Sequence, residues 1–142
     1  MTMNIYIDID GVLLTKKQEL PESSIEFIDF LTTNFSCYWL TTHCRTGENK
    51  ALNYLSKFYD ENVIRKLSKV KSTNWMDLKT EEIDLNSNFI WLEDQPFEAE
   101  KLILKKYDKL ECLLVVDLNK PNELKEVISK IKQQNNIKKV TK

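Results

Sequence analysis

Glycine, cysteine and histidine are scarce in this chain of 142 residues, which has two glycines, three cysteines and one histidine. Cys37, Cys44 and Cys112 are odd in number and lack a motif spacing, so they predict no disulfide framework. His43-Cys44 looks like half of a zinc site, but no second cluster of cysteine and histidine completes it. This cysteine usage favours a reducing, cytoplasmic location.

An excess of one charge and long hydrophobic runs are also missing. The 21 basic and 22 acidic residues leave a net charge of −1 at pH 7, which argues against bulk attraction to nucleic acid or to an anionic membrane. No apolar run approaches the length of a membrane span, and no secretory signal is visible at the N-terminus. We therefore expect no membrane partner and no strong nucleic-acid partner.

The length and the composition, with 42% hydrophobic and 30% charged residues, are those of a single globular domain. We expect one domain over residues 1–142. Its core should span about residues 3–132, and a tail rich in lysine and asparagine, about 133–142, should fray.

Segments typical of strands and of helices alternate along the chain. The apolar patterns predict strands at 3–8, 35–40, 88–92 and 112–116, and a weaker strand beginning at Val63-Ile64. Capping and proline signals predict helices after a Ser23-x-x-Glu26 capping box, after Thr46, over 79–83, from Pro96 and from 119–121. This order predicts an α/β fold, a single Rossmann-like domain whose mostly parallel sheet is sandwiched between helices.

Four of these helices carry apolar residues at helical spacing. The helix after Thr46 has Ala51, Leu52, Leu55 and Phe58, and the last helix has Leu124, Val127, Ile128 and Ile131. The other two sets are Ile25, Ile28 and Leu31 in the first helix, and Ala99, Leu102 and Ile103 in the helix after Pro96.

The most informative segment is Met3 to Leu14, where a short apolar strand leads into Asp8, Asp10 and Gly11. Residues i and i+2 of a strand point the same way, so both carboxylates should project beyond the strand's carboxyl end. Two carboxylates about 4 Å apart repel by roughly 4 kcal/mol at an effective dielectric near 20, so a cation or partner group is needed. A glycine here indicates a turn or a close approach of the backbone.

Two further polar pairs, Thr41-Thr42 and Glu93-Asp94, also follow apolar strands directly. Ligands of parallel α/β folds bind outside the carboxyl ends of the strands. We therefore expect three polar groups from separate segments to meet at one edge of the sheet.

These segments resemble the motifs of the haloacid dehalogenase superfamily of phosphohydrolases, in particular its small members without a cap domain. Three matches carry the resemblance: Asp8-Ile9-Asp10-Gly11-Val12-Leu13 is similar to the first motif, Trp39-Leu40-Thr41-Thr42 to the second and Trp91-Leu92-Glu93-Asp94 to the acidic fourth motif. Lys79 lies where the family has its third-motif lysine, and Lys71 is the second choice. The resemblance covers about residues 3–118, and Glu93-Asp94 departs from the Asp-Asp pair of many relatives.

The resemblance implies a Mg²⁺-dependent phosphatase, a hydrolase that acts through an aspartyl-phosphate intermediate. Asp8 would be the nucleophile, and Asp10 would be the general acid and base. Thr41 would bind the phosphoryl group, and Lys79 would offset negative charge beside it.

The implied Mg²⁺ ligands are Asp8, the backbone carbonyl of Asp10, and Glu93 or Asp94, with Asp94 the first choice. The intervals between Asp10 and Thr41 and between Thr41 and Lys79 leave no room for the separate cap domain of many relatives. An open site is therefore expected, which suits a phosphorylated small molecule or macromolecule, and an oligomeric partner is possible.

Two other functions stay open at this point. One is a catalytically silent relative that acts as a binding module. The other is a phospho-accepting receiver domain, which Lys120-Pro121 favours. Receivers carry adjacent acidic residues after the first strand and an aspartate after the middle strand, whereas here the acids alternate and Val63 to Val70 ends in no aspartate.

Each candidate residue also has a plainer interpretation. Glu93-Asp94 can favour the N-terminus of the helix near Pro96 through the helix dipole. Thr41 can satisfy backbone groups after its strand, and Lys79 can be an ordinary surface lysine. His43 is expected to be a loop residue without a catalytic role.

Overall fold

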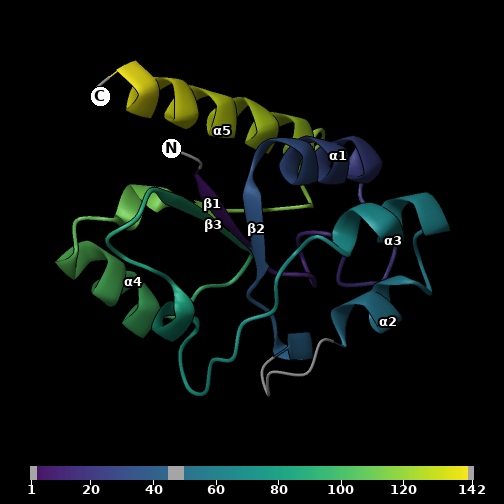
Figure 1. The fold of residues 1–142 in the computed structure, drawn as a ribbon, viewed down its shortest axis with the longest axis horizontal. Coiled ribbons are helices and arrows are strands. Elements are labelled where there is room, and N and C mark those ends of the chain that lie inside the picture. Colours follow the sequence, from purple (N-terminus) through teal and green to yellow (C-terminus); the bar gives the residue numbers. More distant parts are fainter. Residues whose placement is uncertain (1–2, 45–49, 141–142) are drawn as a thin grey trace.

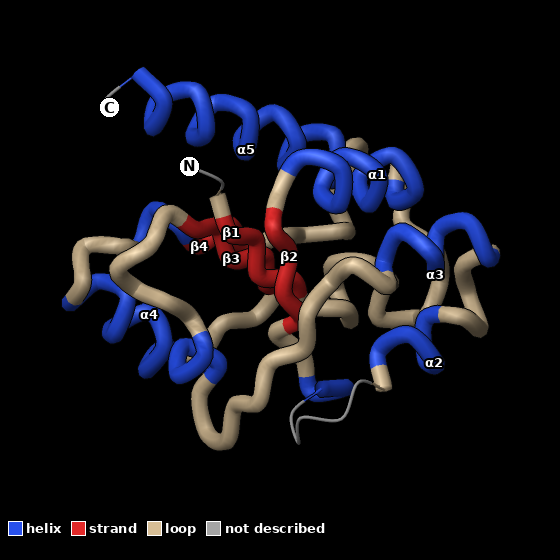
Figure 2. Tube along the Cα trace, in the orientation of Figure 1, coloured by secondary structure: helices blue, strands red, loops and turns tan. Residues whose placement is uncertain are grey.

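In a computed structural model the chain forms a four-stranded, parallel sheet with helices against both of its faces (Figure 1, Figure 2). The structure describes residues 3–44 and 50–140. The strands are β1 (Asn4–Ile7), β2 (Ser36–Trp39), β3 (Phe89–Glu93) and β4 (Leu113–Val115), in the order β2-β1-β3-β4. The predicted α/β class with a parallel sheet is confirmed, and the arrangement is compatible with a Rossmann-like fold.

The helices form one layer on each side of the sheet. Those of the described residues are α1 (Ser24–Asn34), α2 (Ala51–Leu55), α3 (Glu61–Leu67), α4 (Glu98–Lys106) and α5 (Glu123–Val140), with 3-10 segments η1 (Thr42–Cys44), η2 (Lys79–Glu82) and η3 (Leu110–Cys112). Helices α1 and α5 lie against one face, α2 and α3 continue that layer, and α4 with η2 lies against the other (Figure 1).

Strand β1 shows why the sheet is apolar on both faces. Ile5 and Ile7 pack in the core under α1 and α5, while Tyr6, between them, packs with Leu104 of α4 on the opposite face. Successive side chains of a strand point to opposite faces, and here both faces are covered. The strand is apolar and buried from Ile5 to Ile7, so the polar side chains that follow it mark the carboxyl edge of the sheet.

The predicted strand at Val63-Ile64 is wrong. Both residues belong to α3, which begins where the Asp60 carboxylate accepts a hydrogen bond of 3.1 Å from the N–H of Val63. Glu61 lies in the first turn of the helix, and Arg65 and Lys66 lie in the last, which suits the helix dipole. Together with the N-cap, these charges outweigh the strand preference of two β-branched residues. The extended segment comes later, at Lys71, which forms an isolated parallel bridge with Tyr38 of β2.

The first helix differs from its prediction at its start. Ser23 has a left-handed backbone (φ 65°) and makes no side-chain capping bond, so the expected capping box with Glu26 is not formed. Ile25 is exposed, because the buried positions of α1 are Ser24, Phe27, Ile28 and Leu31.

Helix α4 also presents a different face from the one expected. It begins at Glu98, after Pro96, and its buried residues are Glu100 and Leu104, while Ala99 and Leu102 are exposed. The Glu100 carboxylate accepts hydrogen bonds from the N–H groups of Phe97 (2.9 Å) and Lys79 (2.8 Å). These bonds turn Glu100 inward.

The ends of two other predicted helices can also be compared. The expected cap Thr46 lies outside the described residues, and α2 begins at Ala51. Helix α5 continues to Val140, past the point where fraying is expected. Over residues 3–44 and 50–140, no helix combines the length and the apolar character needed to cross a bilayer.

Candidate active site

The carboxyl ends of β1 and β3 lie side by side at the centre of the sheet. Ile7 is in register with Leu92, so Asp8 and Glu93 follow at the same level. The chain leaves β1 toward β2 on one side and leaves β3 toward β4 on the other. Where the connections from two neighbouring strands run to opposite sides in this way, they open the crevice in which α/β folds bind their ligands.

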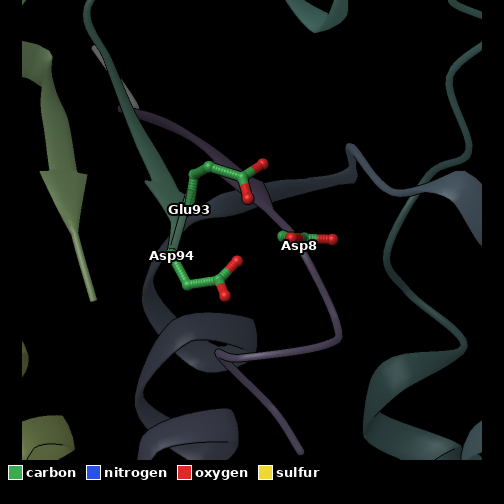
Figure 3. Close-up of side chains that lie close together, drawn as sticks. All are labelled: Asp8, Glu93 and Asp94. Atoms are coloured by element: carbon green, nitrogen blue, oxygen red, sulfur yellow. The ribbon is translucent and has the colours of Figure 1, made fainter. Parts of the chain in front are cut away.

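Three carboxylates meet at this crevice, and we call Asp8, Glu93 and Asp94 the acidic cluster. One oxygen of each lies within 4.8 Å of the others, and Figure 3 shows Glu93 and Asp94 pointing from the end of β3 toward Asp8. Asp8 is 7% exposed and Glu93 is 4% exposed. Buried carboxylates this close need compensating positive charge.

Lys79 of η2 provides part of that charge. Its Nζ lies 2.5 Å from Glu93 Oε1 and 3.5 Å from Asp8 Oδ2. Burial lowers the pKa of Lys79, but Asp8 and Glu93 outweigh burial and raise this pKa above its ordinary value. Burial and then Asp8 raise the pKa of Glu93 despite the bond to Lys79. One lysine therefore does not balance the acidic cluster.

Gly11 packs directly against Asp94. Its φ is +86°, and a Cβ added there would lie only 2.3 Å from Asp94 Oδ2. Both the left-handed backbone and the close approach require glycine. The turn after β1 is thus shaped around the third carboxylate of the acidic cluster.

A second lysine, Lys16, contacts the acidic cluster from its open side and has no signal in the sequence. Its Nζ lies 2.9 Å from Asp94 Oδ2, and its side chain is 62% exposed. The hydrogen bond to Asp94 raises the pKa of Lys16. Lys16 also lines a cavity of about 490 Å³ that reaches Gly11 and Asp94 and extends past Val115 to Asn119.

Asp10 lies apart from the acidic cluster in a second constellation, the Asp10 group, which consists of Asp10, His43, Tyr54 and Gln18. Asp10 Oδ2 lies 3.2 Å from His43 Nε2, and the Tyr54 hydroxyl donates to Asp10 Oδ1 at 3.3 Å. Gln18 Nε2 donates to the same hydroxyl at 3.2 Å, and the rings of His43 and Tyr54 stack with centroids 4.0 Å apart. From the sequence, His43 is expected to be a loop residue without a catalytic role, and no sequence signal indicates a partner for this side chain.

Tyr54 is suited to its position as a donor. Burial and then the negative charge of Asp10 raise the pKa of Tyr54, so its hydroxyl keeps its proton near neutral pH. Neither Tyr54 nor Gln18 belongs to a sequence motif, and the contacts of both depend on how loops and the short helix α2 fold.

The other sequence candidates lie in different surroundings. Thr41 is fully buried at the end of β2, where its Oγ1 accepts a hydrogen bond of 3.4 Å from the N–H of His43. Lys71 lies beside β2, with its Nζ 5.8 Å from the ring centroid of Tyr38. Lys120 is exposed in the loop before α5. Of the two candidate lysines, the structure places Lys79 at the acidic cluster and Lys71 against an aromatic ring.

The acidic cluster offers the ligands that a hard divalent cation prefers. Carboxylate oxygens are typical ligands of Mg²⁺, which binds through one or two carboxylates and substrate phosphates. Three carboxylates face Lys79 and Lys16, and Lys16, whose side chain is 62% exposed, can leave Asp94 for solvent. The residues therefore fit a divalent cation on the side of Asp94.

Comparison of this chain with protein-family models, with curated proteins and with solved structures finds no match.

Proposed function

We propose that this protein is a Mg²⁺-dependent phosphatase of the haloacid dehalogenase type, which hydrolyses phosphomonoesters through an aspartyl-phosphate on Asp8. The observation that carries the proposal is the convergence of the acidic cluster and Lys79 from three separate segments at the crevice between β1 and β3. Acidic residues that merely end strands or cap a helix do not require a buried lysine between them.

Asp8, the backbone carbonyl of Asp10 and Asp94 would hold the metal. Glu93 is the weaker candidate ligand because one of its oxygens bonds to Lys79 at 2.5 Å, whereas the partner of Asp94 is an exposed lysine. When bound, Mg²⁺ neutralises phosphate charge and so permits attack by an anionic carboxylate. Lys79 would remain as the second positive charge beside Asp8.

The protein residues divide the chemistry into two steps. In the first, an oxygen of Asp8 bonds to phosphorus while the bond to the ester oxygen breaks and Asp10 donates a proton to that oxygen. In the second, water attacks the same phosphorus, Asp10 takes up the proton of the water, and Asp8 is released with inorganic phosphate. Lys79 stabilises the negative charge that gathers at the phosphoryl group. Thr41 is the candidate hydrogen-bond donor to this group, but it is fully buried here, so this role requires a local movement that exposes its hydroxyl.

The proposed site does not restrict the substrate to one size. In the described residues only α1 and loops separate β1 from β2, and η1, α2, α3 and η2 separate β2 from β3. A phosphorylated small molecule and a phosphorylated macromolecule both suit a site of this kind.

The first test is hydrolysis of p-nitrophenyl phosphate with and without Mg²⁺. We expect activity that EDTA removes and that Asp8→Asn reduces by about 10³-fold or more. Asp108→Asn is a matched control, since Asp108 lies on the turn after α4, and it should retain activity.

The outcome also separates the alternatives. A panel of nucleotides, sugar phosphates, phosphopeptides and oligonucleotides with terminal phosphates identifies the substrate class. Inactivity toward the whole panel would contradict the proposal and favour a binding module. A stable aspartyl-phosphate formed from a phosphohistidine donor would instead favour a receiver.

A further inference from the structure

We propose that Tyr54 and His43 orient the carboxyl group of Asp10 so that it protonates the leaving alcohol, which makes both of them positioning residues. This inference rests on the proposed function, because only that reaction gives Asp10 an acid–base role. It goes further by assigning two residues outside the family-like motifs to one chemical event, cleavage of the bond to the leaving group.

The first observation is that hydrogen bonds reach Asp10 with a defined direction. Gln18 has only N–H donors at Nε2, so the Tyr54 oxygen accepts there at 3.2 Å. The single hydroxyl hydrogen of Tyr54 is then donated to Asp10 Oδ1, at 3.3 Å. The contact with Tyr54 thus fixes the position of Oδ1, and Oδ2 lies on the side of His43.

The second observation is that His43 fixes the plane of the same carboxyl group. Its Nε2 lies 3.2 Å from Oδ2, and its ring stacks on that of Tyr54 at an interplanar angle of 19°. The two rings come from η1 and α2, while Asp10 follows β1. Three segments thus restrict the rotation of one half-exposed side chain, which is 41% exposed.

Restricting this rotation matters because Asp10 is not held in the way that Asp8 is. Asp8 is buried beside Lys79 and accepts a hydrogen bond from the N–H of Ile9 at 2.8 Å. A carboxyl group on a loop samples several orientations in water, and each unproductive orientation lowers the rate of proton transfer. Tyr54 and His43 remove those orientations before the substrate arrives.

The proton balance follows the two steps given above. The O–H bond of the Asp10 carboxyl group breaks as the O–H bond of the leaving alcohol forms, and the new carboxylate keeps its hydrogen bond from Tyr54. In the second step Asp10 takes one proton from the attacking water, which restores the acid. Tyr54 neither gains nor loses a proton, so it is a positioning residue and not a catalytic one.

The dependence of the rate on the basicity of the leaving group distinguishes a positioning role from a merely structural one, because a structural defect would slow all esters alike. Nitrophenolate leaves without help, whereas a more basic phenolate or an alkoxide must be protonated. A series of p-nitrophenyl, phenyl and p-methoxyphenyl phosphates varies this demand while the shape of the substrate stays similar. The quantity to measure is kcat/KM for each ester at saturating Mg²⁺.

We expect Tyr54→Phe to change hydrolysis of the nitrophenyl ester by less than about threefold and to slow the methoxyphenyl ester by roughly tenfold or more. Asp10→Asn should show the same selectivity with a larger loss, and His43→Ala should resemble Tyr54→Phe. Tyr107→Phe removes the same hydroxyl from an exposed tyrosine at the end of α4 and should leave all three rates unchanged.

Each outcome separates this inference from the proposed function. Equal slowing of all three esters by Tyr54→Phe would overturn the positioning role and leave the phosphatase proposal standing. Unchanged rates for all three esters would do the same. A wild-type protein that hydrolyses none of the esters would overturn the phosphatase proposal and the positioning role with it.

Discussion

The acidic cluster and the Asp10 group share one edge of the sheet but are built in different ways. The acidic cluster stands directly on the ends of β1 and β3, and its members Asp8 and Glu93 are almost completely buried. The Asp10 group is held by a loop, a 3-10 segment and a five-residue helix, and the side chains of Asp10 and His43 are 41% and 23% exposed. The first group is fixed by strand register and the second by side-chain contacts.

The two groups therefore differ in what their contacts control, which is charge in the acidic cluster and side-chain orientation in the Asp10 group. In the acidic cluster, the dominant problem is electrostatic, since buried carboxylates crowd around one lysine. In the Asp10 group, solvent already screens the charge and the contacts fix direction. Variants of the acidic cluster should therefore alter metal binding, stability and rate together, whereas variants of the Asp10 group should alter rate alone.

The largest effect should come from removing the cation of the acidic cluster. We expect Lys79→Met to lower kcat by roughly 10²–10³-fold, because the charge beside Asp8 and the phosphoryl group is lost while the apolar stem is kept. Lys71→Met is the matched control and should stay within about twofold of wild type. Circular dichroism verifies that both variants fold. Equal rates for the two variants would break the distinction between these lysines.

The next effect concerns the turn that packs on the third carboxylate. Gly11→Ala places a Cβ 2.3 Å from Asp94 Oδ2 at a φ of +86°. We expect the free energy of unfolding to fall by about 2 kcal/mol or more, and Mg²⁺ to bind more weakly as Asp94 is displaced. Urea denaturation and calorimetric titration measure the two quantities. Lys17→Ala, in the same loop, should change neither, and wild-type behaviour of Gly11→Ala would contradict the packing.

A third measurement uses pH to test crowding in the acidic cluster. The pKa of Glu93 in the folded protein is about 8, against an ordinary value of 4.5. A carboxyl whose pKa is raised by folding stabilises the folded state at low pH, and this contribution is lost as pH rises from about 4.5 to about 8. In EDTA, wild type should therefore lose on the order of 1–2 kcal/mol relative to Glu93→Gln over this range. Parallel stability curves would show that the acidic cluster is not crowded.

The smallest expected effect concerns the exposed lysine on Asp94. Lys16→Met removes a cation that competes with Mg²⁺ for this carboxylate, so Mg²⁺ should bind about threefold more tightly. Because Lys16 is 62% exposed, the gain should shrink as ionic strength rises. Lys17→Met lowers the net charge of the same loop equally and should have less effect. Weaker Mg²⁺ binding by Lys16→Met would place the metal away from Asp94.

Sequence patterns were sufficient to predict the residues that strands bring together. Apolar strands that end in acidic residues predicted that Asp8 and Glu93-Asp94 would meet, and β1 and β3 bring them together. The requirement for Gly11 also followed from its place after two carboxylates. These features depend on the edge rule of parallel sheets, which is general. The period of a strand did not extend to Asp10, because β1 ends at Ile7 and Asp10 lies with His43 and Tyr54 instead of beside Asp8.

Other parts could not be predicted because long-range contacts decide them. Tyr54 meets Asp10 across 44 residues of chain and Gln18 meets Tyr54 across 36, and neither has a distinctive spacing. The strand expected at Val63 was wrong because an aspartate cap outweighed the preference of β-branched residues. Glu100 turns inward because it bonds to backbone N–H groups of two segments.

The central claim is that one aspartyl oxygen of Asp8, beside a Mg²⁺ held by the acidic cluster, accepts a phosphoryl group. Beryllofluoride forms a stable analogue of an aspartyl-phosphate, so its binding tests this claim without any need to know the substrate. We expect a ¹⁹F resonance of protein-bound beryllofluoride that requires Mg²⁺, disappears with Asp8→Asn and persists with Tyr54→Phe. A bound resonance that survives Asp8→Asn, or none with the wild-type protein and Mg²⁺, would contradict the account.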